Sequence, residues 1–103
     1  MERDPGNMVD RYTISILKGD IQEENRYFKE LHLLDKQYPQ VAWSAEVRDL
    51  LEVNRKIWEL EATIGRTALE IRGLNNRRIE LKNHINELTG NPTKEIKKDH
   101  ASV

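Results

Sequence analysis

The feature that most constrains this chain is a regular seam of mostly apolar residues, spaced three and four apart, between residues 50 and 88. Such spacing has a period of 3.5 residues, which keeps one face of a helix apolar along its length and favours coiled-coil-like packing. The seam consists of Leu50, Val53, Ile57, Leu60, Ile64, Thr67, Ile71, Leu74, Arg78, Leu81, Ile85 and Leu88. Its only polar members are Thr67 and Arg78. The pattern predicts one long helix from about residue 45 to residue 89.

Two glycines, Gly65 and Gly73, lie within the seam and raise the question of whether this helix is continuous. A turn at Gly65 would give a three-helix bundle in which the last helix covers the first two. A turn has no reason to preserve the heptad phase, however, and the phase is preserved. We therefore predict a continuous helix, with the three-helix bundle as the alternative. Gly90 predicts the end of this helix.

A shorter helix is predicted before the seam, over residues 8–37, because apolar residues there also follow steps of mostly three and four. Gly19 interrupts this pattern, and Asp20 followed by Glu23 resembles a capping box. A break at Gly19 is therefore the alternative to a continuous helix that tolerates the glycine, which we predict.

The segment between the two helices, residues 38–43, is predicted to be a turn because Pro39 disfavours helical geometry at the preceding residue. Its apolar side chains, Tyr38, Val41 and Trp43, are expected to pack together over the end of a hairpin.

These elements predict an all-α fold, an antiparallel helical hairpin that forms a single domain over residues 8–90. Residues 1–7 are predicted to be a disordered lead-in, and residues 91–103 a polar, flexible tail. The composition agrees with an elongated shape. Of 103 residues, 37% are hydrophobic and 34% are charged, against about 45–50% and about 25% in typical globular domains.

The unequal lengths of the two helices leave the last part of the seam uncovered. In a hairpin, the start of the first helix would lie beside Ile71 of the second helix, and nothing would cover the residues after Ile71. An apolar stripe exposed beyond that point would be an interaction surface. A symmetric homodimer, or a higher homo-oligomer, is the simplest way to bury it. The predicted interface consists of Leu74, Arg78, Leu81, Ile85 and Leu88.

A polar stripe flanks the same part of the seam, where Asn75, Arg78, Lys82 and Asn86 fall within one arc of the helix. Arginine and lysine at such positions pack the aliphatic part of their side chains against apolar surface and keep the charged group in contact with water. They can pair with Asp10 or with a carboxylate of a partner chain. We interpret the stripe as a device that fixes register and partner choice. The alternative is an anion site for a phosphate or sugar nucleotide, lined by Asp10, Asn75, Arg78, Lys82 and Asn86.

Several kinds of chemistry have no motif in this sequence. There is no cysteine, which excludes thiolate metal sites, and the three histidines do not have metal-ligand spacing. No glycine-rich phosphate loop or nucleophile elbow is present. Helical pyrophosphate hydrolases need two pairs of carboxylates to hold Mg²⁺. This chain has Glu46, Asp49 and Glu52 at such spacing on one helix, but it has no two glutamates three residues apart, so half of the metal site is missing. We predict no catalytic residue, no metal and no cofactor, and lean against an enzyme.

Charge and hydropathy limit the partners and the location. The net charge of −1 gives no overall basic field for nucleic acid. The longest run without a charged residue is far shorter than the roughly 20 residues of a membrane span, and the first residues lack the apolar core of a signal peptide. A cytoplasmic protein with protein partners, and no membrane association, is predicted.

Three segments, VDRYTISILK at 9–18, VNRKIWELEATI at 53–64 and NNRRIELKNHINELTG at 75–90, resemble a family of short, uncharacterised bacterial helical proteins. That family is often found beside glycosyltransferase and surface-polysaccharide genes. The positions that match its motifs are Asp10, Thr13, Asn54, Trp58, Asn75, Arg78, Lys82 and Asn86, with Glu95 and Lys97 loosely matching its tail. The resemblance covers most of the chain but implies no activity. This sequence departs from the family between Ile64 and Ala68, where it has almost no linker and its relatives have a longer one. The difference favours the uninterrupted helix over a bundle like that of the family.

The sequence therefore predicts a small helical protein that acts as a non-catalytic, oligomerising interaction module. The alternative is a small enzyme or ligand-binding bundle that uses Arg78 and Lys82 to hold a phosphorylated or sugar-nucleotide ligand.

Overall fold

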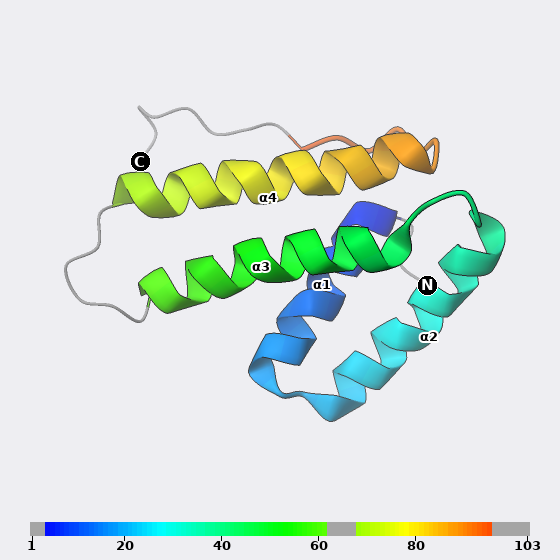
Figure 1. Ribbon diagram of the computed structural model, residues 1–103, viewed down its shortest axis with the longest axis horizontal. Coiled ribbons are helices and arrows are strands. Elements are labelled where there is room, and N and C mark those ends of the chain that lie inside the picture. Colours follow the sequence, from blue (N-terminus) through cyan, green and yellow to red (C-terminus); the bar gives the residue numbers. More distant parts are fainter. Residues whose placement is uncertain (1–3, 62–67, 96–103) are drawn as a thin grey trace.

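The computed structural model describes residues 4–61 and 68–95, which form four helices (Figure 1). The helices are α1 (Pro5–Lys18), α2 (Ile21–Gln37), α3 (Trp43–Glu61) and α4 (Ala68–Leu88). The described residues contain no strand, which confirms the all-α prediction for this part of the chain. Figure 1 shows α3 and α4 side by side and antiparallel; α1 contacts both, and α2 packs on α1.

The predicted continuous helix over residues 45–89 is wrong. Helix α3 ends at Glu61, and α4 begins at Ala68 and lies beside α3. The two halves of the apolar seam therefore pack in one core instead of forming one exposed stripe. The regular spacing of apolar residues could not distinguish one continuous helix from two separate helices. Two helices whose connection has a suitable length show the same unbroken spacing along the sequence. Gly65, the predicted site of the alternative turn, lies outside the described residues.

The first predicted helix is also divided, at Gly19. The φ angle of Gly19 is 71°, a left-handed conformation that favours glycine. The amides of Gly19 and Asp20 donate to the carbonyl oxygens of Ile16 and Ser15, at 3.1 Å each, which is the Schellman ending of a helix. The Asp20 carboxylate then accepts from the Glu23 amide at 3.1 Å and caps α2. The break is thus the alternative that the capping residues had indicated.

Helix α1 begins earlier than predicted, within the segment expected to be a disordered lead-in. Asp4 is its N-cap and accepts a hydrogen bond of 3.0 Å from the Asn7 amide. Pro5 occupies the first turn, where its missing N–H costs nothing. Residues 5–7 are therefore helical, and Pro5 and Gly6 are buried.

The core is formed by all four helices and extends to the turn before α3. Its buried apolar side chains are Met8, Val9, Tyr27, Leu34, Val41, Trp43, Leu50, Val53, Ile57, Leu81 and Ile85. The apolar side chains of the turn are covered, as expected, since Val41 and Trp43 are buried and Tyr38 packs against the core, although the hairpin over which they were expected to lie is not present. The Trp43 indole N–H donates to the Tyr38 carbonyl oxygen at 3.1 Å, which satisfies the polar atom of this buried ring.

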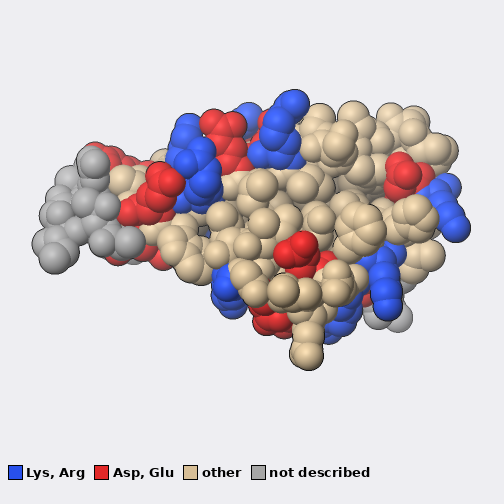
Figure 2. Space-filling model, turned by 60° about the horizontal axis from the view of Figure 1, so that its bottom comes forward, with Lys and Arg blue, Asp and Glu red and all other residues tan. Residues whose placement is uncertain are grey.

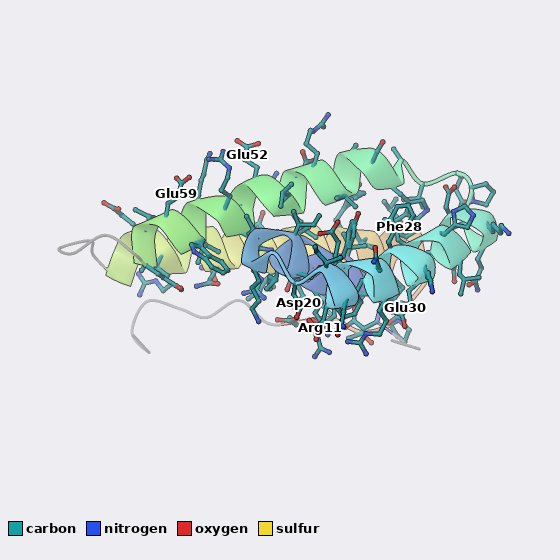
Figure 3. All side chains as sticks on the ribbon, turned by 90° about the horizontal axis from the view of Figure 1, so that it is seen from below. Arg11, Asp20, Phe28, Glu30, Glu52 and Glu59 are labelled. Atoms are coloured by element: carbon teal, nitrogen blue, oxygen red, sulfur yellow. The ribbon has the colours of Figure 1, made fainter. Side chains whose placement is uncertain are left out.

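The surface carries charges of both signs. In Figure 2, lysine and arginine are interspersed with aspartate and glutamate, and neither sign forms a continuous area on that face. Figure 3 shows Glu52 and Glu59 extending from α3 away from the other helices. Both belong to pairs at helical spacing, Lys56–Glu52 at 3.3 Å and Arg55–Glu59 at 3.0 Å. Among the described residues, no helix has the length and apolar character to cross a membrane.

Candidate functional site

A buried polar network joins α1, α3 and α4 at the place where they cross. Asp10 of α1 is 1% exposed. Its carboxylate accepts from the Arg78 Nε at 2.8 Å and from a terminal nitrogen of the same guanidinium at 2.5 Å. The Asn54 side-chain amide, from α3, donates to the same carboxylate and to the Thr13 hydroxyl, at 2.8 Å each. One carboxylate thus holds three helices together.

The Arg78–Asp10 contact is a two-point ion pair between residues 68 positions apart. Both carboxylate oxygens accept from one planar guanidinium, the geometry in which arginine binds carboxylates most specifically. The hydrogen bond that Arg78 donates to Asp10 is the main reason that the pKa of Arg78 is raised above its ordinary value, with burial acting in the opposite direction. Arg78 is therefore a permanent cation already matched by an anion of its own chain.

A second part of the network anchors the N-terminal turn of α1 to α4. The Asn86 side-chain oxygen accepts from the Gly6 amide at 2.8 Å, and its nitrogen donates to the Asp4 carboxylate at 2.7 Å. Asn86 is 2% exposed. The backbones approach closely here, because a Cβ on Gly6 would lie 2.9 Å from the carbonyl carbon of Lys82 and 3.0 Å from its Cα. Glycine permits this contact.

The third part of the network fixes the segment that follows α4. Gly90 ends the helix with a φ angle of 71°, as predicted, and the chain then turns back along α4. The Asn83 side chain donates to the Glu95 carbonyl oxygen at 2.9 Å and accepts from the Glu95 amide at 3.0 Å. Lys82, which is 6% exposed, forms an ion pair with the Glu95 carboxylate. The described part of the predicted flexible tail is thus held in place; residues 96–103 lie outside it.

The structure brings together most of the residues that the sequence suggested as a ligand site. Asp10 and Arg78 contact each other, and Lys82 and Asn86 continue the network along α4. Asn75 is half-buried and makes none of these contacts. Of the two kinds of partner considered for the stripe, Asp10 and a carboxylate of a second chain, Arg78 contacts Asp10 in the structure, at the place where α1, α3 and α4 cross.

The residues predicted as a dimer interface have a different environment from the one expected. Leu81 and Ile85 are 6% and 0% exposed and belong to the core, and Leu74 packs against it. Arg78 pairs with Asp10. Leu88 is 40% exposed. Most of the apolar stripe from which the interface was inferred is therefore covered within the chain, because α4 packs against α1 and α3.

The sequence reasoning missed Asp4, Gly6 and Asn83, and it assigned Asn54 and Glu95 no contact. Asp4 followed by Pro5 is a recognisable helix start, and it would have placed Gly6 in the first turn. Nothing in the local pattern marks Asn83, because its hydrogen-bond partner is the backbone of Glu95.

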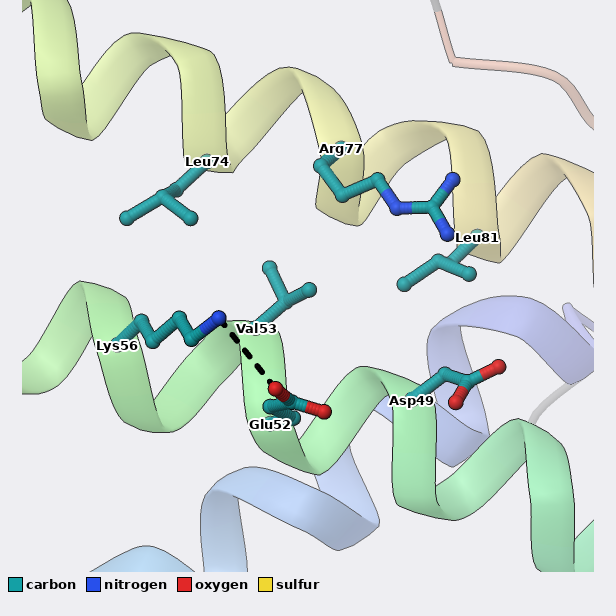
Figure 4. A pocket seen from close by; sticks show the side chains of 7 residues that line it. All are labelled: Asp49, Glu52, Val53, Lys56, Leu74, Arg77 and Leu81. Atoms are coloured by element: carbon teal, nitrogen blue, oxygen red, sulfur yellow. Dashed lines mark ion pairs between the residues drawn. The ribbon is translucent and has the colours of Figure 1, made fainter.

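A shallow cleft of about 300 Å³ lies between α3 and α4 (Figure 4). Val53, Leu74 and Leu81 line it, together with Asp49, Glu52, Lys56 and Arg77. Both of its cations are paired with acids on their own helices, Lys56 with Glu52 at 3.3 Å and Arg77 with Glu80 at 3.5 Å. The cleft therefore presents a balanced set of charges around an apolar floor.

The arrangement holds α1, α3 and α4 in register. Each cation of the stripe, Arg78 and Lys82, already has a carboxylate partner in the chain. The described residues contain no group of three histidine, cysteine, aspartate or glutamate side chains that could hold a metal ion. The network accounts for the residue types at these positions without a ligand.

Comparison with protein-family models, curated proteins and solved structures finds no match to this chain.

Proposed function

We propose that this protein is a non-catalytic interaction module, in which the polar stripe of α4 fixes the fold and leaves the outer surface free to bind a protein partner. The observation that supports this proposal best is that Arg78 and Lys82 are each neutralised by a carboxylate of the same chain, Asp10 and Glu95. An anion site needs cations that can be offered to the ligand. A ligand at Arg78 would first have to displace Asp10, whose side chain is 1% exposed and lies where three helices meet.

The mixed charges of the surface agree with a protein partner. A ligand-binding enzyme would concentrate one sign of charge in its cleft to attract a phosphorylated substrate. The cleft between α3 and α4 instead carries two acids and two bases. The cytoplasmic location predicted from the sequence belongs to the same proposal.

A thermal-shift screen tests this proposal against the ligand-binding alternative. Inorganic phosphate, nucleoside diphosphates, nucleotide sugars and sugar phosphates are expected to leave Tm unchanged, relative to potassium chloride of equal ionic strength. A ligand present at 100 times its Kd would stabilise the fold by about 2.7 kcal/mol, which is readily measured. A saturable rise in Tm that Arg78→Ala abolishes would overturn the non-catalytic proposal in favour of the ligand site.

The homodimer predicted from the sequence is part of this proposal, with a different contact surface. Ile21 and Phe28 are 70% and 54% exposed, and they lie seven residues apart on one face of α2. We expect sedimentation equilibrium to give twice the chain mass of 12.1 kDa, and Phe28→Glu to return the protein to a monomer. A mass of one chain for the unmodified protein at 100 µM would remove the homodimer and leave only a foreign partner.

A further inference from the structure

The side chains that hold the segment after α4 form a distinct binding surface, which we call the tail clamp and define as Lys82, Asn83 and Asn86. Its occupant is the tail segment, Thr93–Glu95. The Asn83 amide makes two hydrogen bonds to the Glu95 backbone, at 2.9 and 3.0 Å. The Asn86 amide donates to the Thr93 carbonyl oxygen at 3.3 Å. The tail clamp therefore holds a non-helical segment at two places along its backbone, Thr93 and Glu95.

The two asparagines recognise groups that every peptide has. A backbone carbonyl and amide offer the same acceptor and donor whatever the side chain, and extended peptides are commonly bound through such main-chain hydrogen bonds. Thr93 and Lys94 are exposed, so their side chains contribute little to the contact. The two asparagines thus require a certain path of the bound backbone but place no requirement on the side chains of the bound segment.

Lys82 adds the requirement for an acid. Its side chain is 8% exposed, and its ammonium group pairs with the Glu95 carboxylate. A cation with so little access to water is costly without a counter-charge. Any segment that replaces the tail must therefore bring a carboxylate to the position of Glu95. The tail clamp combines sequence-independent backbone contacts with one charge-specific contact.

The tail segment itself is placed so that it can leave. The Glu95 side chain is 42% exposed, and the segment contributes no residue to the apolar core. Segments with few buried apolar contacts open at a lower free energy than the fold as a whole. The clamp residues, by contrast, lie on α4, and Asn86 is also fixed by Gly6 and Asp4. The surface persists when the segment departs.

We propose that the tail clamp binds an extended, acidic segment of a partner protein, and that the tail segment occupies the clamp until such a partner displaces it. This inference rests on the proposed function, since it names the chemistry of the partner of a non-catalytic module. A glutamate preceded by two residues offers the same carboxylate and backbone groups that Lys82, Asn83 and Asn86 contact in Thr93–Glu95.

The test uses the full chain with Glu95→Arg, in which the tail is repelled by Lys82 and the clamp is open. The probe is a fluorescein-labelled peptide of residues 91–97, NPTKEIK, followed by fluorescence anisotropy. We expect saturable binding to Glu95→Arg and binding about tenfold weaker, or more, to the unmodified chain, where the tethered tail competes. A peptide with glutamine in place of its glutamate is expected to bind about tenfold more weakly.

The matched control is Glu95→Arg combined with Asn83→Ala, which keeps the tail released and removes the backbone contacts. Equal binding to the two receptors, or no binding to either, would overturn the inference. Such a result would leave the proposed function standing, because that is decided by the thermal-shift screen. A doubled mass of the unmodified chain that Glu95→Arg abolishes would show that a second copy supplies the segment, which also overturns the inference as stated.

If Glu95→Arg does not fold, the unmodified chain gives the same information by NMR. Addition of unlabelled peptide at millimolar concentration is expected to shift the backbone resonances of residues 93–95 progressively, as the tail is displaced. Unchanged resonances would contradict the proposal.

Discussion

Replacing Arg78 by methionine is expected to lower the free energy of unfolding by about 3–5 kcal/mol, the usual cost of leaving one member of a buried ion pair without its partner. Methionine keeps the apolar stem and removes the charge and the two hydrogen bonds to Asp10. Asp10 is 1% exposed, so its carboxylate cannot reach water when Arg78 is lost. Since small domains are stable by about 5–15 kcal/mol, this is a large part of the total. Urea unfolding followed by circular dichroism measures it.

The opposite replacement, Asp10→Asn, is expected to cost less than Arg78→Met. The side chain of Arg78 is 29% exposed, so its guanidinium reaches water when the carboxylate is lost, and Asn54 can still donate to the remaining side-chain oxygen. Comparing the losses in unfolding free energy of Arg78→Met and Asp10→Asn tests whether the buried carboxylate needs its partner more than the partly exposed guanidinium does. Equal effects, or a smaller one for Arg78→Met, would show that the pair is not buried asymmetrically.

A matched control comes from α3, where Arg55 pairs with Glu59 at 3.0 Å on the surface. The side chains are 52% and 62% exposed, and exposed pairs at this helical spacing contribute about 0.3–0.5 kcal/mol. Arg55→Met should therefore hardly change the unfolding curve. A loss at Arg78 no greater than the loss at Arg55 would contradict the structural role assigned to the network.

The polar stripe could be located from the sequence, but its partners could not all be found there. Arg78 was conspicuous because it interrupts an apolar seam, and helical spacing placed Lys82 and Asn86 beside it. Asp10 was a predicted partner. Asn54 and Glu95 received no partner because their contacts depend on how α3 and the tail lie against α4. Periodicity describes one helix, whereas these contacts depend on tertiary packing.

The fold was predicted in class but not in topology, for a related reason. The seam correctly indicated that Leu50, Val53, Leu81 and Ile85 would be buried. It did not indicate which surface would bury them, because a partner chain and a second helix of the same chain satisfy the same pattern. At Gly19 the local signals for a break, a glycine and a capping aspartate, were present. In the structure these local signals decide the outcome, and the helix is divided at Gly19 although the apolar pattern continues across it.

Gly6→Ala is expected to destabilise the fold by about 1–3 kcal/mol, the typical cost of overpacking a closely packed site. The added Cβ would collide with the carbonyl group of Lys82, which belongs to the helical backbone of α4 and cannot rotate away like a side chain. To relieve this collision, α1 must move from α4. That movement also weakens the 2.8 Å hydrogen bond from the Gly6 amide to Asn86, whose contribution of about 1 kcal/mol is included in the expected loss.

Gly73→Ala is the matched control, because it makes the same chemical change on an exposed face of α4 where a Cβ would meet nothing within 4 Å. Glycine within a helix is about 0.5–1 kcal/mol less favourable than alanine, so this variant should be more stable than the unmodified chain. The two replacements are thus expected to shift the urea midpoint in opposite directions. A stabilising effect at Gly6 would mean that α1 and α4 do not approach closely there, and that the anchoring of the α1 N-terminal turn by Asn86 is wrong.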